Sequence, residues 1–317
     1  MPKTICVTGA AGFIGSNLVD RLLKNTDCSI VGIDNFDDYY DPKVKEKNIE
    51  GARSSLRFTM HRGDVSNMDE LEKLSSDIDV IVHLAAKAGV RPSIARAKEY
   101  FDTNLGGTVN LLEFAKKRGI RQFVLASSSS VYGENPHRPW REDAEDLFPV
   151  SPYAVSKLSA EKAGYAYSYL HGIRILALRL FSVYGPRQRP DLLISKFASL
   201  IEAGRPLPVY GTGESKRDFT YVEDVTKIIT AAITYNKSNY EVVNVGARQP
   251  AAVMDIIKLL SLALKKPYKL SWEPAQAGDV AHTEASTCKL FSIFEPIEPV
   301  SLEDGIAAYI KWRQGLP

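Results

Sequence analysis

The stretch TGAAGFIG, residues 8–15, decides the fold of this chain of 317 residues. It follows the short apolar run Thr4–Thr8 and precedes a segment with leucines at helical spacing. Gly9, Gly12 and Gly15 permit a tight turn and a close approach of the backbone to a bound group. The stretch therefore predicts a strand, a glycine-rich turn and a helix N-terminus suited to a diphosphate.

The same alternation of strand and helix continues through the first half of the chain. Nearly all-apolar strands alternating with helices are typical of a parallel sheet covered on both faces. The sequence predicts an α/β fold, a doubly wound parallel Rossmann sheet with a smaller C-terminal substrate-binding region. The expected strands are 4–8, 29–34, one within 57–65, 79–86, 122–127 and 174–180; the expected helices are 15–24, 68–74, 95–118 and 153–170.

Beyond about Phe181 the pattern loosens, and turn signals such as GPRQRPD and AGRPLPVYGTGES become frequent. We therefore expect residues 1–180 to form one domain and residues 181–317 a smaller, irregular region. Segments near 220–246 are expected to return to the first domain, because DVTKIITAAITY and EVVNVGA resume the helix and strand patterns.

Composition excludes several classes of protein. A net charge of +2 and a charged content of 25% do not suggest a partner that is a nucleic acid or a membrane surface. No run approaches the ~20 apolar residues of a membrane span, and the N-terminus lacks the pattern of a signal peptide. Cys6, Cys28 and Cys288 show no metal-ligand spacing, so we expect no metal, buried reduced thiols and a cytoplasmic protein.

An acidic residue at the end of the second strand indicates the bound cofactor. Asp34 lies 19 residues after Gly15, where a carboxylate can bind both hydroxyls of an adenosine ribose and would repel a 2′-phosphate. This favours NAD over NADP, against the alternative of a glycine turn without a ligand. Asp64 and Val65 are expected to end the third strand near the adenine, unless Asp64 is simply a solvated acid. His83 is expected to be a core histidine rather than a catalyst.

The segment SPYAVSK places Tyr153 and Lys157 on one face of a helix, four residues apart. A phenol with an ordinary pKa near ~10 is a poor base, but a neighbouring ammonium and a positive nicotinamide both favour phenolate. The stretch SSSSVYG, residues 127–133, follows an apolar strand, at the strand end where ligands bind in open α/β sheets. One of its hydroxyls can share the substrate proton with Tyr153.

Taken in order, these features resemble the extended short-chain dehydrogenase/reductase family. The set comprises the three glycines, Asp34, HLAA, Asn104, SSSSVYG and the Tyr153/Lys157 pair. Within the family the chain resembles the nucleotide-sugar epimerases, most closely the UDP-glucuronate 4-epimerases, through LRLFSVYGPRQRPD, YGTGESKRDFTYVEDV and GDVAHTEAS. The resemblance implies a tightly held NAD that is recycled within each turnover. It also implies a homodimer built on the two long helices, although those helices could simply cover the sheet.

The resemblance assigns residues 1–180 to binding NAD and residues 181–317 mainly to binding a UDP-sugar. Tyr153, Lys157 and Ser128 are the implied catalytic residues. The cofactor set implied is Gly9, Gly12, Phe13, Ile14, Gly15, Asp34, Asn35, Asp64, Val65, Leu84, Ala85, Ala86, Lys87, Asn104, Tyr153 and Lys157.

Two departures from related enzymes narrow the reaction. The 4,6-dehydratases have an Asp-Glu pair where this chain has Ser129 and Ser130, and UDP-glucuronate decarboxylases have a Glu in place of Ser130. Without these acids, epimerisation is the remaining reaction. UDP-galactose 4-epimerases tend to have Asn in place of Ser182, which leaves room here for a larger C5 substituent. The substrate set implied is Ser128, Ser129, Ser130, Ser182, Arg187, Arg189, Tyr210, Arg217 and Asp279.

The expected function is 4-epimerisation of UDP-glucuronate to UDP-galacturonate through a 4-keto intermediate, without decarboxylation. Alternatives are a 4-epimerase of UDP-glucose/galactose or of UDP-N-acetylhexosamines, a UDP-glucuronate decarboxylase, and an NAD-binding regulator without activity. Ser129, Ser130 and Ser182 are expected to bind the sugar carboxylate. Either Arg187 or Arg189 would contact the substrate and Arg217 the diphosphate, unless each arginine is a solvated surface charge.

Overall fold

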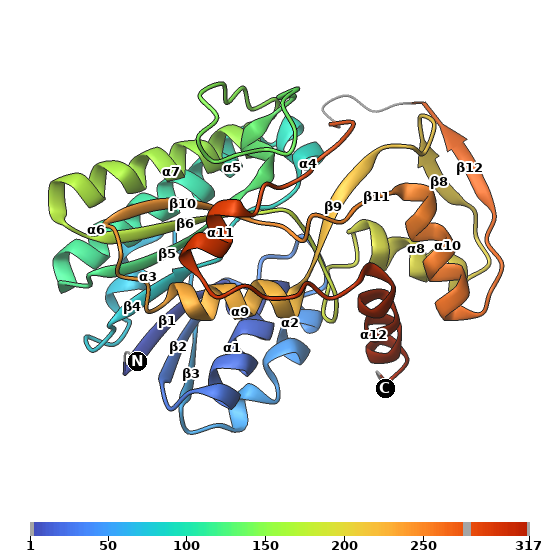
Figure 1. Cartoon of the computed structure of the whole chain (residues 1–317). Helices are drawn as coiled ribbons and strands as arrows, with labels where there is room; N and C mark the ends of the chain where they lie inside the picture. Colours follow the sequence, from blue (N-terminus) through green and yellow to red (C-terminus); the bar gives the residue numbers. More distant parts are fainter. Residues whose placement is uncertain (1–2, 275–279, 316–317) are drawn as a thin grey trace. The chain divides into compact units, whose positions relative to one another are not determined.

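The computed structural model describes residues 3–274 and 280–315, and the chain divides into two compact units (Figure 1). The first unit comprises the chain up to Glu134, Asp146–Leu180 and Thr226–Val243. The second comprises Asn135–Glu145, Phe181–Val225 and the chain from Asn244 onward. Residues 135–145 belong to the second unit, and the segment 226–243, which lies within the expected 220–246, belongs to the first.

The first unit is built on a seven-stranded sheet, which confirms the predicted doubly wound α/β fold. Strands β1 to β6 pair in parallel, with registers such as Thr8↔His83 and Ser128↔Leu180. Parallel strands bring their carboxyl ends to one edge of the sheet. The strand order is β10 (Tyr240–Val245), β6 (Arg174–Leu180), β5 (Gln122–Ser128), β4 (Val80–His83), β1 (Thr4–Thr8), β2 (Ser29–Asp34) and β3 (Phe58–Arg62).

Helices lie on both faces of this sheet (Figure 1). One face carries α3 (Met68–Glu72), α6 (Gly107–Arg118) and α7 (Pro152–His171); the other carries α1 (Phe13–Asn25), α2 (Pro42–Ile49) and α9 (Val222–Ala232). The core beneath α6 and α7 contains fully buried side chains such as Leu111, Phe123 and Ile175. The continuous apolar strands are therefore buried on both sides, as their sequences predicted.

Two helical predictions in this unit were incomplete. The single helix expected over 95–118 is divided into α5 (Ala97–Tyr100), a π-helical segment Phe101–Gly106 and α6, and α4 (Val90–Ala95) precedes them. Such a π-segment often marks a functional site. Helix α2 was not predicted, because its sequence PKVKEKNI is highly charged. Its start nevertheless follows the usual pattern, since Asp41 caps the amide of Lys43 and proline occupies the first position.

The second unit is more regular than the sequence suggested, so the expectation of an irregular region was wrong. It has a three-stranded sheet of β7 (Ser182–Tyr184), β9 (Lys216–Tyr221) and β11 (Pro250–Ala252), and β8 (Leu207–Tyr210) pairs with β12 (Leu270–Glu273). Its helices are α8 (Leu193–Glu202), α10 (Val253–Leu264), α11 (Cys288–Ile293) and α12 (Leu302–Gln314). These elements enclose their own core, which includes Tyr184, Leu260 and Tyr309.

Across residues 3–274 and 280–315, none of the helices combines the length and the apolar character needed to cross a bilayer. The same residues contain no group of three or more potential metal ligands. Cys6 and Cys28 are buried, and burial raises the pKa of the Cys6 thiol to about 12, which keeps that thiol protonated. Cys288 is exposed, so the prediction of burial was wrong for this cysteine.

Candidate active site

The glycine turn between β1 and α1 has no room for side chains at two positions. Gly9 has φ of +67°, and a Cβ there would meet the backbone of Ala85 at 2.9 Å. A Cβ on Gly15 would lie 2.1 Å from the carbonyl oxygen of Gly9. Gly12 is the N-cap of α1, and no side chain caps it. Because Gly12 has no side chain, the N-cap residue leaves the first-turn amides, which include Phe13 and Ile14, without a side-chain acceptor.

Asp34 lies beneath this turn and is 6% exposed. Its carboxylate accepts hydrogen bonds from the amides of Ala11 (3.2 Å) and Phe36 (2.8 Å). The ammonium of Lys45 lies 3.5 Å from Asp34 Oδ1, and both side chains are buried. Sequence reasoning missed Lys45, because α2 was not predicted and a lysine in a charged segment gives no signal of burial.

A threonine at the end of β1 shapes the next loop. Thr8 Oγ1 accepts the amides of Leu84 (3.1 Å) and Ala85 (3.0 Å), so β4 ends at His83 rather than at Ala86 as expected. The hydroxyls of Thr8 and Thr108 lie 2.7 Å from Nδ1 and 3.1 Å from Nε2 of His83. Burial lowers the pKa of His83 to about 3, so the ring is neutral and serves the core, as predicted.

The π-segment holds Asn104 against two other elements. Asn104 Oδ1 accepts the amide of Lys87 at 2.8 Å, and Nδ2 donates to the carbonyl of Lys87 and to Ser156 Oγ on α7. Lys87 in turn pairs with Asp37 (3.0 Å) and Glu99 (3.3 Å). Burial alone would lower the pKa of Lys87, but these carboxylates raise it overall. The structure thus brings together Lys87 and Asn104, with Ala86 in the adjoining loop.

Asp64 and Val65 lie in the turn after β3, which ends at Arg62, so the prediction that they end the strand was wrong. Asp64 accepts hydrogen bonds from Ser66 and from Asn35 Nδ2, the latter at 2.8 Å. Partial burial would raise the pKa of Asp64, but these donors lower it overall. The carboxylate is therefore ionised and tied to Asn35 at the end of β2.

The serine stretch follows β5, at the carboxyl edge of the sheet. Ser128 is 7% exposed, and its Oγ accepts the amide of Ser130 (3.1 Å) while donating to Ser130 Oγ (3.2 Å). Ser129 and Ser130 begin the short 3₁₀ turn Ser129–Tyr132. The hydroxyls of Ser128 and Ser130 are therefore adjacent.

Helix α7 carries the other two predicted catalytic residues. Ser151 caps its N-terminus and Pro152 is its first residue, so Tyr153 lies in the first turn and Lys157 one turn later. Lys157 is buried, and its ammonium donates to the carbonyl of Ala126 at 2.8 Å. Burial lowers the pKa of Lys157 to about 8, although Glu161 opposes this shift. The Tyr153 ring packs edge-on against Tyr100, with the ring centroids 6.2 Å apart.

The remaining predicted residues belong to the second unit. Ser182 begins β7, Tyr210 ends β8 and Arg217 lies on β9, where β7 and β9 pair directly. Arg189 makes a bidentate pair with Asp191 (2.9 and 2.6 Å), and Arg187 adopts φ of +67°, which is uncommon for arginine. Asp279 lies outside the described residues.

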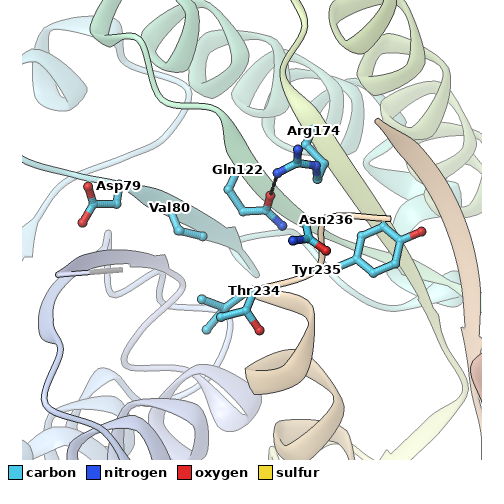
Figure 2. Close-up of a pocket in the computed structure, with 8 residues that line it drawn as sticks. Asp79, Val80, Gln122, Arg174, Thr234, Tyr235 and Asn236 are labelled. Atoms are coloured by element: carbon cyan, nitrogen blue, oxygen red, sulfur yellow. Dashed lines mark hydrogen bonds between the residues drawn. The ribbon is translucent and has the colours of Figure 1, made fainter. Parts of the chain in front are cut away.

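A pocket of about 370 Å³ occurs at the opposite edge of the first unit's sheet (Figure 2). Val80, Gln122 and Arg174 line it, and each is the first residue of its strand. Arg174 donates to the side chain of Gln122 at 3.3 Å, and Gln122 donates to the carbonyl of Ala232. This pocket therefore lies away from the serine stretch and from the carboxyl ends of the strands, where the candidate site is.

Comparison with known proteins places this geometry in a family. Residues 5–246 match the model of the NAD dependent epimerase/dehydratase family. The chain belongs to the NAD dependent epimerase/dehydratase family. A UDP-glucuronate 4-epimerase of Thermodesulfobacterium geofontis is 36% identical over 312 residues, which cover 97% of this chain and 95% of the relative.

Two solved structures of the family are also similar. That of UDP-glucuronic acid 4-epimerase from Bacillus cereus, in complex with UDP-glucuronic acid and NAD, has a TM-score of 0.92 and 38% identity, and covers 98% of this chain and 99% of that chain. That of UDP-N-acetylglucosamine 4-epimerase from Methanobrevibacter ruminantium M1, in complex with UDP-N-acetylmuramic acid, has a TM-score of 0.88 and 31% identity, with 99% and 98% covered. Membership of the epimerase/dehydratase family agrees with the resemblance seen in the motifs.

Proposed function

We propose that this chain is an isomerase that converts UDP-glucuronate to UDP-galacturonate by NAD-dependent 4-epimerisation. The observation that carries the proposal is the placement of Tyr153 and Lys157 one turn apart on α7, in a unit whose Ser128 ends β5 at the ligand-binding edge of the sheet. The relatives that act on UDP-glucuronate support the choice of substrate.

The residues of the first unit fit NAD. The glycine turn lets the backbone approach a diphosphate, and the uncapped first turn of α1 offers amide donors. Asp34 would bind the adenosine ribose, Asn35 and Asp64 would lie near the adenine, and Lys157 would bind the nicotinamide ribose. When bound, NAD supplies the chemistry of removing hydride from C4 of the sugar and returning it to the opposite face.

The proton transfer is assigned to side chains of this chain. Tyr153 phenolate accepts the proton of the 4-hydroxyl, with Ser128 hydrogen-bonded to the same oxygen, and later returns it. The Lys157 ammonium stabilises the phenolate by its charge. The 4-keto sugar turns over while its UDP group remains bound, and Arg217 is assigned to the diphosphate on the family resemblance.

The serines after Ser128 are assigned to the uronate carboxylate, together with Ser182 and Arg189; Arg187 and Tyr210 complete the proposed substrate set. A 4-keto uronate is a β-keto acid, which loses CO₂ when the breaking bond aligns with the carbonyl π system. Hydroxyls of Ser129 and Ser130 that hold the carboxylate out of this alignment, without donating a proton to carbon, would suppress the loss.

The second candidate is 4-epimerisation of a UDP-N-acetylhexosamine, favoured by the likeness to the Methanobrevibacter ruminantium enzyme. On the family resemblance we further propose a cytoplasmic homodimer that retains its NAD through purification. The decarboxylase alternative is disfavoured, because this chain has Ser130 where those enzymes have a glutamate.

The test is incubation of the purified protein with UDP-glucuronate and no added NAD, followed by NMR. Formation of UDP-galacturonate without UDP-pentose or CO₂ is the expected result. Conversion of UDP-N-acetylglucosamine with no conversion of UDP-glucuronate would replace this function with the second candidate. No turnover of any UDP-hexose, with NAD added, would indicate an NAD-binding regulator instead.

A further inference from the structure

The first serine of the stretch, Ser127, has no part in the proposed chemistry. Its side chain is buried, and its Oγ donates to Glu161 Oε1 of α7 at 2.5 Å. Glu161 is 1% exposed, although a glutamate in a helix is normally a surface residue. A buried carboxylate is retained only where hydrogen bonds or opposite charges compensate the loss of water.

Arg179 of β6 supplies that compensation. Its Nε donates to Glu161 Oε1 at 3.0 Å and its Nη2 to Oε2 at 2.8 Å, a bidentate pair in which both side chains are at most 3% exposed. The guanidinium also lies over the ring of Tyr132, 4.8 Å from the centroid. The side chain of Glu161 therefore accepts three hydrogen bonds, one from Ser127 of β5 and two from Arg179 of β6.

The position of Glu161 along α7 gives this ion pair its significance. Tyr153, Lys157 and Glu161 follow at intervals of four, so they lie along one helical face. Ser127 and Arg179 are Cα partners in the β5–β6 register, next to the pair Ser128↔Leu180. The carboxylate thus joins the helix that carries Tyr153 to the strand that carries Ser128.

We propose that Glu161 is a positioning residue for the epimerisation proposed above: its carboxylate, held by Ser127 and Arg179, fixes α7, and with it Tyr153 and Lys157, against the end of β5. The inference rests on the proposed function only for its kinetic readout. It concerns a residue that touches neither the cofactor nor the substrate in the proposed mechanism.

Two titratable groups that face Lys157 or this pair from other strands, His83 and Tyr240, are uncharged near neutral pH. His83 of β4 interacts electrostatically with Lys157, but burial holds it neutral because its pKa is about 3. Tyr240 of β10 donates to the backbone carbonyl of Glu161 at 3.0 Å, and burial raises the pKa of its phenol. Tyr132 lies beneath Arg179 and Tyr153 is the proposed base. The charge of Glu161 raises the pKa of Lys157 against the effect of burial.

The electrostatic consequence has a definite sign. Burial lowers the pKa of Lys157 to about 8, and the charge of Glu161 acts in the opposite direction. Glu161→Gln removes that charge and leaves Arg179 without its carboxylate, so the pKa of Lys157 falls further. We expect the alkaline limit of kcat to move down by about one pH unit.

The experiment measures pH profiles of kcat and kcat/KM for the NAD-containing wild type, Glu161→Gln and the double variant Glu161→Gln/Arg179→Met. The double variant removes both buried charges, so it keeps the test valid where the single variant does not fold. We expect its alkaline limit between those of the wild type and Glu161→Gln. Glu113→Gln is the matched control, because Glu113 accepts a hydrogen bond from Tyr167 of α7 far from Lys157; its profile should keep both limits.

A second readout does not need turnover. In protein labelled with [ε-¹³C]lysine, the resonance absent from Lys157→Met reports the ionisation of Lys157, and its midpoint should fall in Glu161→Gln. A lower midpoint in a protein that turns over no UDP-hexose would sustain the role of Glu161 while the proposed function fails. Equal midpoints and equal alkaline limits in all variants, with only a uniform loss of rate, would reduce Glu161 to a structural residue and overturn the proposal.

Discussion

The buried His83 makes the free energy of unfolding depend on pH. The ring is neutral in the folded protein because burial lowers its pKa to about 3, whereas an unfolded histidine has a pKa of about 6.5. The unfolded state therefore binds the extra proton first as the pH falls. The stability from this group is present above pH ~6.5 and is lost towards pH ~3.

The expected slope is about 1.4 kcal/mol of unfolding free energy per pH unit over that window. Between pH 6.5 and 4.5, the wild type should lose about 2–3 kcal/mol more than His83→Gln, measured by urea unfolding. His137→Gln is the control, since His137 is exposed. If wild type and His83→Gln lose stability in parallel, the ring is not held neutral.

In the proposed reaction, we expect Ser130 to decide whether the 4-keto intermediate is epimerised or loses CO₂. Ser130→Glu supplies an acid next to Ser128, so we expect formation of UDP-pentose and CO₂ to rise by about 10²-fold. Ser130→Gln is the control, because glutamine has the size of glutamate but carries no acid. It also removes the Ser128–Ser130 hydrogen bond, so a difference between the two variants reports proton donation alone. NMR of the products measures both. The absence of pentose from both variants would argue against the carboxylate clamp.

Among the elements, the glycine turn is the one that the sequence specified best. β1 and β2 have the expected bounds, Thr4–Thr8 and Ser29–Asp34. A short apolar run bounded by turn residues is recognised in the sequence as a strand. The long helix over 95–118 was predicted as continuous, because nothing in its composition reveals a π-segment. The structure offers a reason for the π-segment, because Asn104 within it makes hydrogen bonds to Lys87 and Ser156.

The turn makes a sharp prediction. Gly15→Ala would place a Cβ 2.1 Å from the backbone oxygen of Gly9, so the turn must open. We expect a loss of about 1–3 kcal/mol of stability and loss of the NAD that should co-purify with the wild type. Gly51→Ala is the control, because no atom lies within 4 Å of its added Cβ. Retention of NAD by Gly15→Ala would show that this turn does not bind the diphosphate.

At the scale of the whole chain, the first unit was largely predictable and the second was not. Parallel strands of the first unit are apolar throughout, so each is visible in the sequence by itself. In the second unit the paired strands β8 and β12 are more than sixty residues apart in the sequence, as in the pair Leu207↔Leu270. Other strands, such as Ser182–Tyr184, are too short to be recognised from the sequence. Likewise, the burial of Lys45 and Glu161 could not be predicted, because both residues are charged and are buried only by tertiary contacts.

The homodimer proposed on the family resemblance can be tested at the surface of α7. Tyr169 and Leu170 are 80% and 67% exposed near its C-terminal end, an apolar pair that a second copy would cover. Tyr169→Glu/Leu170→Glu should convert a dimer into a folded monomer, as measured by analytical ultracentrifugation and circular dichroism. Leu56→Glu, at a fully exposed leucine outside α7, should leave the dimer intact. Burying a charge in a helix-helix interface costs far more free energy than placing the same charge on a solvated turn, because the buried charge loses its water. A wild type that sediments as a monomer at micromolar concentration, or a dimer unaffected by the double change, would assign this face another role.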